Sequence, residues 1–326
     1  MKIIAVVAGG YSGEYDISLR SAEMVMQTIN KKKFESYKVV ISKNAWEVWD
    51  NEKKYTIDKN DFSFIKAKKR IKFDAAYIIL HGTPGEDGKL QGYLDMIGVP
   101  YTSPGMFESA VTMNKYISKK ICGDAGLNVA KSVLVRSTEA TIDIDKMVKM
   151  LGLPCFVKPN NGGSSVATTK AYTKAQLVNG MEEAFQHDDE VIVEEFIKGR
   201  EVTCGVFFNG KDIVALPVTE IIPLNDFFDY EAKYEGKSNE VTPAEINANT
   251  YKKIQEKTIE VYRLLNLSGM VRIDFMLKGA TPYFMEVNTI PGFSKASIIP
   301  QQIRAAGLKE SDVITMLIEQ TLRRKK

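Results

Sequence analysis

Apolar runs that alternate with helical patterns organise the first hundred residues. Residues 3–7, 37–41 and 75–80 are mostly apolar, and residues 17–29 carry apolar side chains at helical spacing. Buried strands that alternate with helices form mostly parallel sheets, whose functional loops follow the C-terminal ends of the strands. The first segment is therefore predicted to be an α/β domain with a mostly parallel sheet.

The pattern changes beyond residues 99–105, a stretch rich in proline and glycine that is a candidate linker. A second segment of mixed helices and strands is predicted, and then a third that opens with two strands joined by Asn209-Gly210, a strong hairpin turn. The predicted helices lie at 107–125, 175–185, 250–265 and 311–323, and the predicted strands at 156–159, 190–196, 201–208 and 212–218.

Residues 271–288 predict a hairpin with two unlike faces. If it folds about Ala280, side chains two apart share a face of each strand. The polar face then carries Arg272, Asp274, Glu286 and Asn288, with Asp274 opposite Glu286 and Arg272 opposite Asn288. The other face carries the apolar residues Ile273, Phe275, Met285 and Val287.

Two carboxylates that face each other across a ladder repel, unless a cation lies between them. Carboxylate and amide oxygens without His or Cys suit a hard cation such as Mg²⁺, which usually accompanies phosphates. The hairpin therefore suggests an enzyme that uses a metal and a nucleotide. The alternative is a solvated strand face with surface ion pairs, which is the commoner use of such residues.

A loop rich in glycine and serine, residues 161–166, follows the strand that carries Lys158. In isolation an ordinary surface loop is favoured. Its functional interpretation is a phosphate cover, because glycines let the backbone approach an anion and a lysine adds positive charge. Lys115 could contact the same phosphates, although a lone helical lysine is usually solvated. Glu194 and Glu195 follow three apolar residues, so one of them must face inward if this segment is a strand. The segment is either a strand end that reaches water, or a carboxylate and a backbone edge that bind a nucleobase.

Other candidates keep two interpretations each. His81 ends an apolar strand in a loop with many turn-forming residues, and a structural role is as plausible there as a functional one. Glu14, which follows the turn after the first strand, has the same status. Residues 228–234 mix charged and aromatic side chains and form either a mobile lid or a plain loop.

Composition excludes several classes. The chain has 326 residues and a net charge of +3, which gives no reason to expect a nucleic-acid partner. Three separated cysteines and two histidines exclude a disulfide framework and a His-rich metal site. The apolar start is too short for a signal peptide and no apolar run reaches membrane-spanning length, so a cytoplasmic location without membrane contact is expected.

Five motifs occur in one order along the chain. They are Gly9-Gly10-x-Ser12-x-Glu14-x-x-x-Ser18, His81-Gly82-x-x-Gly85-Glu86-Asp87-Gly88-x-x-Gln91-Gly92, Gly163-Ser164-Ser165-Val166, Tyr230-Glu231-Ala232-Lys233-Tyr234, and Arg272-x-Asp274 with Glu286-x-Asn288-x-x-Pro291-Gly292. Together they resemble the D-alanine–D-alanine ligase family of the ATP-grasp superfamily, and the resemblance covers nearly the whole chain.

The resemblance implies a three-domain ATP-grasp fold of class α/β (α+β). Residues 1–103 would form an N-terminal parallel α/β sheet domain, and residues 104–197 and 198–326 would form two α+β domains that clasp ATP. ATP would be a co-substrate with two Mg²⁺ ions, which Mn²⁺ could replace. The small-molecule substrates would be D-alanine and ATP, and the enzyme would be a homodimer.

The resemblance also implies roles for single residues. Metal ligands would be Asp274, Glu286 and Asn288. ATP would contact Lys115, Lys158, Ser165, Glu194, Ile197, Glu201 and Lys233. The D-alanines would contact Glu14, His81, Arg272, Ser297 and Ile298. Catalysis would involve Glu14, Ser164 and Tyr234 as a hydrogen-bonded set, and Arg272 with the Gly292 N–H group at the tetrahedral oxyanion.

The implied reaction is phosphorylation of one D-alanine carboxylate and attack of a second amine on the acyl phosphate, which yields D-alanyl-D-alanine for peptidoglycan. Ala167 stands where the family commonly has glycine. Tyr234 stands where relatives that make an ester often have histidine, so it favours the dipeptide. The alternatives are a ligase that uses D-serine or D-lactate second, and a nucleotide-binding module without turnover, against which Arg272 argues.

Overall fold

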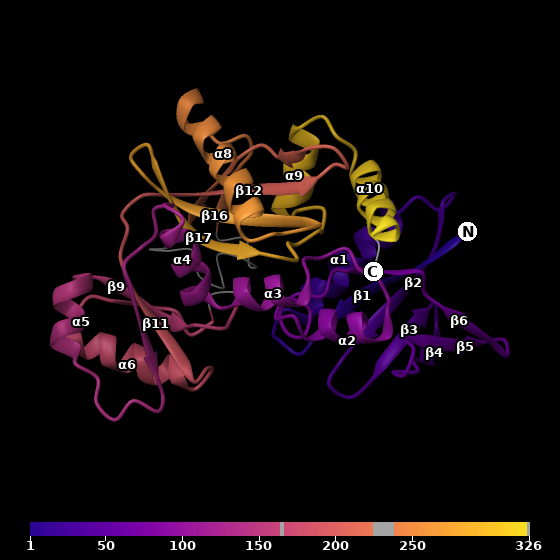
Figure 1. Cartoon of the computed structure of the whole chain (residues 1–326), viewed down its shortest axis with the longest axis horizontal. Helices are drawn as coiled ribbons and strands as arrows, with labels where there is room; N and C mark the ends of the chain where they lie inside the picture. Colours follow the sequence, from indigo (N-terminus) through magenta and orange to yellow (C-terminus); the bar gives the residue numbers. More distant parts are fainter. Residues whose placement is uncertain (164–165, 224–237, 325–326) are drawn as a thin grey trace.

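The computed structural model describes residues 1–163, 166–223 and 238–324 (Figure 1). The strand order of the first sheet is β4-β3-β2-β1-β7. Its strands are β1 (Lys2–Gly9), β2 (Phe34–Ile41), β3 (Trp46–Asp50), β4 (Lys53–Thr56) and β7 (Ala75–Ile78), and α1 (Tyr15–Thr28) and α2 (Lys89–Ile97) belong to the same region. A separate two-stranded ribbon pairs β5 (Ser63–Lys66) with β6 (Lys69–Lys72).

The mostly parallel first sheet is confirmed only for its strands β2, β1 and β7. β1 runs parallel to β2 and to β7, whereas β2, β3 and β4 pair antiparallel. The reason is loop length, since a few residues can connect antiparallel neighbours but a parallel pair needs a long crossover. Because β1 and β7 are parallel, the turn after β1 and the loop after β7 still lie at the same end of the sheet.

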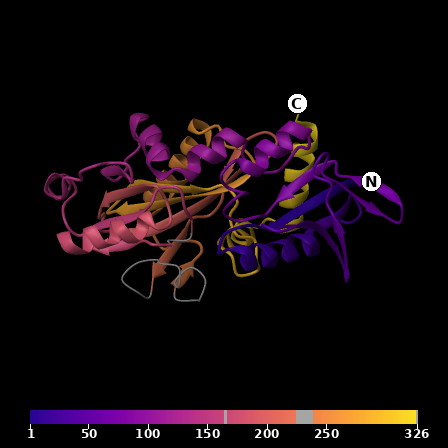
Figure 2. The ribbon, with the colours of Figure 1, turned by 90° about the horizontal axis from the view of Figure 1, so that it is seen from below.

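The second sheet is antiparallel throughout, in the order β10-β9-β11-β8. Its strands are β8 (Ser132–Arg136), β9 (Cys155–Pro159), β10 (Thr169–Ala171) and β11 (Glu190–Glu195), and its helices are α5 (Ile144–Leu151) and α6 (Lys174–Phe185). Leu177, Val157 and Val193 are among the buried residues of a core that belongs to this unit alone. This unit and the first sheet lie at opposite ends of the molecule (Figures 1 and 2).

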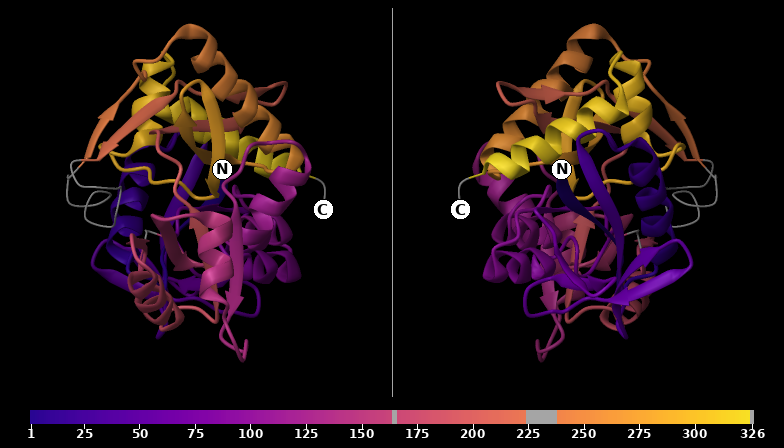
Figure 3. Two further views of the ribbon diagram at one scale, coloured as in Figure 1. Left: turned by 90° about the vertical axis from the view of Figure 1, so that its left-hand side faces the viewer. Right: turned by 90° about the vertical axis from the view of Figure 1, so that its right-hand side faces the viewer.

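The third sheet has the order β15-β14-β12-β16-β17, with β13 paired to β12. Its strands are β12 (Arg200–Phe208), β13 (Ile213–Ala215), β14 (Thr219–Pro223), β15 (Ser238–Val241), β16 (Met270–Lys278) and β17 (Thr281–Asn288), and its helices are α8 (Ala248–Leu264), α9 (Ile298–Ala305) and α10 (Glu310–Arg323). Helix α10 packs on the first sheet (Figure 3), and its Ile314 and Leu317 share one hydrophobic cluster with Val6 and Ile78.

The predicted helix at 107–125 is wrong as a single element. Helix α3 (Met106–Met113) ends before Asn114, and α4 (Lys115–Asp124) begins after it. The side chain of Asn114 accepts a hydrogen bond from the Ile117 N–H group at 2.9 Å and caps α4. Asparagine favours this capping position because it satisfies a donor that the helix itself leaves unpaired. The break places Lys115 at the first turn of a helix.

The sequence analysis also concerned the cysteines and the possibility of a membrane-spanning helix. Cys122, Cys155 and Cys204 are all buried free thiols. Among the described residues, no helix combines the length and the apolar character needed to cross a bilayer.

Candidate active site

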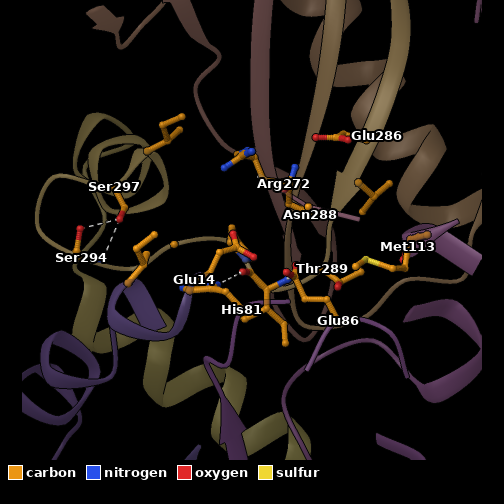
Figure 4. A pocket seen from close by; sticks show the side chains of 18 of the residues that line it. Glu14, His81, Glu86, Met113, Arg272, Glu286, Asn288, Thr289, Ser294 and Ser297 are labelled. Atoms are coloured by element: carbon orange, nitrogen blue, oxygen red, sulfur yellow. Dashed lines mark hydrogen bonds between the residues drawn. The ribbon is translucent and has the colours of Figure 1, made fainter. Parts of the chain in front are cut away.

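A cavity of about 520 Å³ lies where the first sheet, α3, α4 and the β16–β17 hairpin meet (Figure 4). Most of the predicted site residues that the structure describes line it. They are Glu14, His81, Lys115, Arg272, Glu286, Asn288, Gly292, Ser297 and Ile298. Ser164, Ser165, Lys233 and Tyr234 lie outside the described residues. The fold thus gathers side chains from distant segments around one space.

The β16–β17 hairpin confirms the predicted facing pairs through an unpredicted turn. Asp274 pairs with Glu286 and Arg272 with Asn288. The strands turn at Gly279-Ala280, however, and the register shifts between Asp274 and Phe275. Without that irregularity a two-residue turn would set Asp274 opposite Met285. A bulge adds one residue to one strand, and here it rotates Glu286 to face Asp274.

The bulge also corrects the predicted apolar face. Met285 was expected in the core, but Phe284 takes that place and is 1% exposed, while Met285 is half-buried. The rings of Phe275 and Phe284 pack edge-to-face with centroids 6.4 Å apart. Ile273, Phe275 and Val287 are buried as predicted.

Asp274 is the most constrained acidic residue of the cavity region, since it is 3% exposed. Arg272 donates from Nε to Oδ1 and from Nη2 to Oδ2, both at 2.9 Å. Asn288 Nδ2 donates to Oδ2 at 2.9 Å, and the Thr203 hydroxyl donates to Oδ1. A carboxylate offers about four lone-pair sites, so these donors fill its acceptor capacity. The burial excludes a solvated strand face for Asp274.

The facing carboxylates have cationic side chains as partners in addition to the predicted metal ion. Arg272 neutralises Asp274, and the Nζ atom of Lys115 lies 3.8 Å from Glu286 Oε2. Within the described part of the chain, no group of three or more His, Cys, Asp or Glu side chains is arranged to hold a metal. The oxygen-only set of Asp274, Glu286 and Asn288 nevertheless suits Mg²⁺ in its chemistry. It could admit an ion once a donor to Asp274 moves away.

His81 lies beside Glu14 at the edge of the first sheet, and it is 4% exposed (Figure 4). Its Nδ1 atom lies 2.8 Å from the Ile290 carbonyl oxygen, which can only accept, so Nδ1 carries the proton. Its Nε2 atom lies 3.2 Å from the hydroxyl of Ser21. Burial lowers the pKa of His81 below its ordinary value. The imidazole is therefore a neutral ring with protein partners on both nitrogens.

Glu86 is a site residue to which the sequence analysis assigned no role, although it lies within the second motif. Its Oε2 accepts from the Gly82 N–H group at 2.8 Å and its Oε1 from the Ile290 N–H group at 3.1 Å. Burial, and then the negative charge of Glu14, raise the pKa of Glu86 to about 7. A carboxylate among turn-forming glycines was the available signal, but only the fold shows what it faces.

The predicted phosphate residues lie around the start of α4. The Lys115 ammonium contacts the carbonyl oxygen of Gly162. Asn160, which is fully buried, accepts from the Tyr116 N–H group through Oδ1 at 2.9 Å and from the Lys115 N–H group through its carbonyl at 3.1 Å. These bonds fix the glycine-rich loop after β9 against the helix that carries Lys115.

A buried charge cluster surrounds Glu194, one of the predicted ATP-binding residues. Glu194 faces inward and is 4% exposed, and its carboxylate pairs with Lys158 at 2.7 Å and with Lys119. Burial opposes ionisation of Glu194, but the two cations outweigh it and lower its pKa to about 2. Burial lowers the pKa of Lys119 to about 8. Sequence analysis missed Lys119 because a helical lysine is usually solvated.

The remaining predicted residues lie at two places. Ile197 is half-buried between β11 and β12, and Glu201 is half-buried on β12 opposite Met276. Ser297 immediately precedes α9, and its Oγ accepts from the Ser294 N–H group at 2.9 Å. A Cβ atom at Gly292 would lie 3.0 Å from the Ser297 Oγ, so glycine permits this close approach.

Comparison with known proteins identifies the family. The model "D-ala D-ala ligase N-terminus" matches residues 3–104, and "D-ala D-ala ligase C-terminus" matches residues 121–319. The D-alanine–D-alanine ligase of Porphyromonas gingivalis is 44% identical over 322 residues, with 98% of each chain covered. That of Parabacteroides distasonis is 45% identical over 328 residues, with 100% of this chain and 99% of the relative covered.

Solved structures agree with the sequence comparison. The VanG D-Ala:D-Ser ligase from Enterococcus faecalis aligns with a TM-score of 0.88 at 34% identity and covers 98% of this chain and 99% of its own. The Bacillus anthracis D-alanine–D-alanine ligase complexed with ATP aligns with a TM-score of 0.80 at 33% identity. The alignment covers 99% of this chain and 98% of that ligase. With a common fold and whole-length similarity, this chain belongs to the D-alanine–D-alanine ligase family of ATP-grasp enzymes.

Proposed function

We propose that this protein is an ATP- and Mg²⁺-dependent ligase that joins two D-alanines into D-alanyl-D-alanine for peptidoglycan synthesis. One observation carries the proposal. A single cavity joins Glu14, at the edge of the first sheet, to Arg272, Glu286 and Asn288 on the third sheet. An amino acid and a phosphate donor can therefore meet in one space, in a chain whose curated relatives of similar length are D-alanine–D-alanine ligases.

The reaction has two steps. A carboxylate oxygen of the first D-alanine attacks the terminal phosphorus of ATP, and ADP leaves. The amine of the second D-alanine then attacks the acyl carbon, loses a proton and expels phosphate. Donors that meet charge as it develops contribute most to such a step. Arg272 and the Gly292 N–H group would stabilise the tetrahedral oxyanion, with Glu14, Ser164 and Tyr234 as the remaining catalytic set.

The binding residues follow the same proposal. Glu14 would accept the ammonium group of the first D-alanine, with His81 beside it, and Ser297 and Ile298 at the start of α9 would contact the second. ATP would contact Lys115, Lys158, Ser165, Glu194, Ile197, Glu201 and Lys233. Asp274, Glu286 and Asn288 would hold Mg²⁺, which when bound neutralises phosphate charge.

A second candidate function has one observation in its favour. The VanG protein, whose name describes a D-Ala:D-Ser ligase, aligns with a TM-score of 0.88. A different second substrate is compatible with the same fold, because one exchanged side chain at the second-substrate site can change selectivity. Tyr234, the residue that favours the dipeptide, lies outside the described residues.

Phosphate release with purified enzyme, ATP and Mg²⁺ tests both candidates. D-Alanine alone should support release, and L-alanine should not. D-Serine or D-lactate added to limiting D-alanine should add little product, as measured by mass spectrometry. Absence of D-alanine-dependent release would refute the ligase function, and a mixed product in excess of D-alanyl-D-alanine would favour the second candidate.

The proposal extends to assembly and location. A homodimer in the cytoplasm follows from the family resemblance and from the need for ATP. The buried free thiols agree with a reducing compartment. Sedimentation velocity at micromolar concentration should show a species of twice the chain mass, and a monomer at that concentration would contradict the dimer.

A further inference from the structure

The peptide segment Ile290–Phe293 is held from outside by the first sheet and its helix α1. Glu86 accepts from the Ile290 N–H group at 3.1 Å, and the His81 Nδ1–H group donates to the Ile290 carbonyl at 2.8 Å. Both polar groups of one residue's backbone are thus bound by side chains some two hundred residues away in the sequence. Figure 4 shows His81 and Glu86 side by side next to Thr289.

Ser21 binds the other end of this segment. The Phe293 N–H group donates to the Ser21 Oγ at 3.2 Å, and that hydroxyl lies 3.2 Å from His81 Nε2. Because Nδ1 carries the imidazole proton, Nε2 accepts and the Ser21 hydroxyl donates to it. Ser21 is fully buried and His81 nearly so, and buried hydrogen bonds hold geometry strongly because an unmade bond is costly.

Gly292 lies between the two bound positions. Its backbone already packs so closely on Ser297 that a side chain would need the Ser297 hydroxyl to give way. An N–H group stabilises a developing oxyanion only if it points at the position where the charge appears, and small displacements reduce the effect sharply. A segment anchored at Ile290 and at Phe293 leaves Gly292 little freedom.

We infer that Ser21, His81 and Glu86 form a clamp that positions the Gly292 N–H group for the ligase reaction. The clamp residues act through the segment and are positioning residues, and both ring nitrogens of His81 serve the clamp. The inference rests on the proposed function, because it takes the Gly292 N–H group as an oxyanion donor. It adds Ser21 and Glu86 to the residues on which turnover depends.

Ser21→Ala tests the clamp with a small change. It removes the hydroxyl that binds Phe293 and His81 and retains the volume of a small side chain. We expect kcat and the affinity for a D-alanyl phosphinate dipeptide analogue, a tetrahedral mimic bound with ATP, to fall together by about 10- to 100-fold. The KM for ATP should not change. Ser21→Thr, which keeps the hydroxyl, should recover most of the loss.

Ser109→Ala is the matched control. Ser109, on α3, is also fully buried, and its hydroxyl donates to the Pro104 carbonyl oxygen at 3.4 Å, outside the clamp. It should leave phosphinate affinity unchanged. The inference would be overturned if Ser21→Ala keeps wild-type phosphinate affinity, or if its phosphinate affinity falls no further than that of Ser109→Ala. Loss of activity without loss of phosphinate affinity would overturn it as well.

Glu86→Gln keeps the inference testable if Ser21→Ala fails to fold. Glu86 uses a separate oxygen for each N–H group, and the amide of Gln keeps only one acceptor oxygen. Amide exchange at Gly82 or Ile290, followed by NMR, should therefore quicken, and phosphinate affinity should fall. Faster exchange with full phosphinate affinity would refute the clamp. A wild-type enzyme without D-alanine-dependent phosphate release would instead refute the proposed function, so the two failures are distinguishable.

Discussion

At the scale of single residues, the charged side chains in and around the cavity neutralise one another. Asp274 is bound by Arg272, Glu286 lies near Lys115, and Glu194 lies between two lysines. An unpaired buried charge is costly, and each pair avoids that cost. Phosphates and metal ions are themselves charged, so binding them exchanges one set of partners for another.

Arg272 and a metal ion should compete for Asp274, because the carboxylate has no acceptor site to spare. Arg272→Met should therefore bind Mn²⁺ more tightly, by about tenfold for the loss of two charged hydrogen bonds, while turnover collapses. Mn²⁺ affinity is measured by electron paramagnetic resonance with a non-hydrolysable ATP analogue. Arg20→Met, which removes the same charge from the cavity lining, is the control. If Mn²⁺ affinity rises equally in both variants, or does not rise in Arg272→Met, Arg272 and the metal ion do not compete for Asp274.

Glu86 should make turnover depend on pH near neutrality. Its pKa is raised from 4.5 to about 7, and the charged groups that face it are Glu14 and Arg272, with neutral His81 alongside. Only the ionised form accepts fully from Gly82 and Ile290, so kcat should fall as the pH drops through 7. Folding stability has the opposite sign, because the folded protein binds the extra proton between pH 4.5 and 7, and stability falls as pH rises there.

Glu86→Gln is the test of this dependence. The pH profile of kcat should lose its limb near pH 7 in the variant, and thermal unfolding should lose its slope between pH 4.5 and 7. A limb that persists unchanged in Glu86→Gln would assign the titration to another group.

At the scale of elements, two local irregularities place the site. The bulge in the β16–β17 hairpin turns Glu286 toward Asp274, and the break between α3 and α4 starts a helix at Lys115. At both places, a departure from regular backbone geometry directs a side chain into the cavity. Bulges and helix caps commonly serve this purpose next to active sites.

Asn114 should support nucleotide binding through the position of α4. It caps α4 and donates from Nδ2 to Asn161 Oδ1 at 2.9 Å, next to the glycine-rich loop. Asn114→Ala should lower the free energy of unfolding by about 1 kcal/mol and raise the KM for ATP. Asn247→Ala is the matched control, because Asn247 caps α8 through the Thr250 N–H group at 2.8 Å, away from the cavity.

The control separates the two effects. Asn247→Ala should cost a similar free energy of unfolding with an unchanged KM. If both variants change the KM for ATP equally, or neither does, the positioning role of Asn114 is wrong.

At the scale of the whole molecule, the hydrophobic cores do not follow the order of the chain. One cluster joins the first sheet to α9 and α10, while the second sheet has a core of its own. We propose the boundaries 1–103, 104–197 and 198–326 for the domains, and each of the three larger sheets lies within one of these ranges. The first and third of these should nevertheless unfold together.

Two buried leucines test this coupling. Leu317→Ala, on α10, should destabilise the joint core by about 2–5 kcal/mol, as cavities in close-packed cores do. Leu177→Ala, on α6, should weaken the second core. Hydrogen exchange followed by mass spectrometry should quicken in both the first sheet and α9–α10 for Leu317→Ala, and only in β8–β11 with α5 and α6 for Leu177→Ala. Faster exchange confined to α10 in Leu317→Ala would contradict the joint core.

The sequence by itself determined the fold class and the family, and it predicted that Asp274 faces Glu286, although the bulge that produces this pairing is seen only in the fold. Periodicity, glycine-rich turns and the order of motifs are local properties, so they can be recognised along the chain. It also predicted that Glu194 or Glu195 faces inward, and Glu194 does. It could not show which partner neutralises each carboxylate, because Arg272, Lys115 and Lys119 are ordinary cationic residues until packing removes water around them.

Only the tertiary structure decided the rest. The bulge at Met285 and the break at Asn114 are seen only in the folded backbone, and the hydrogen bonds of Ser21 and Glu86 join residues that are far apart along the chain. Burial then sets the protonation of His81 and Glu86, since desolvation acts only after the fold has closed around them. The residue types indicate the kind of reaction, whereas the geometry of the site depends on which sheets and loops meet at the cavity.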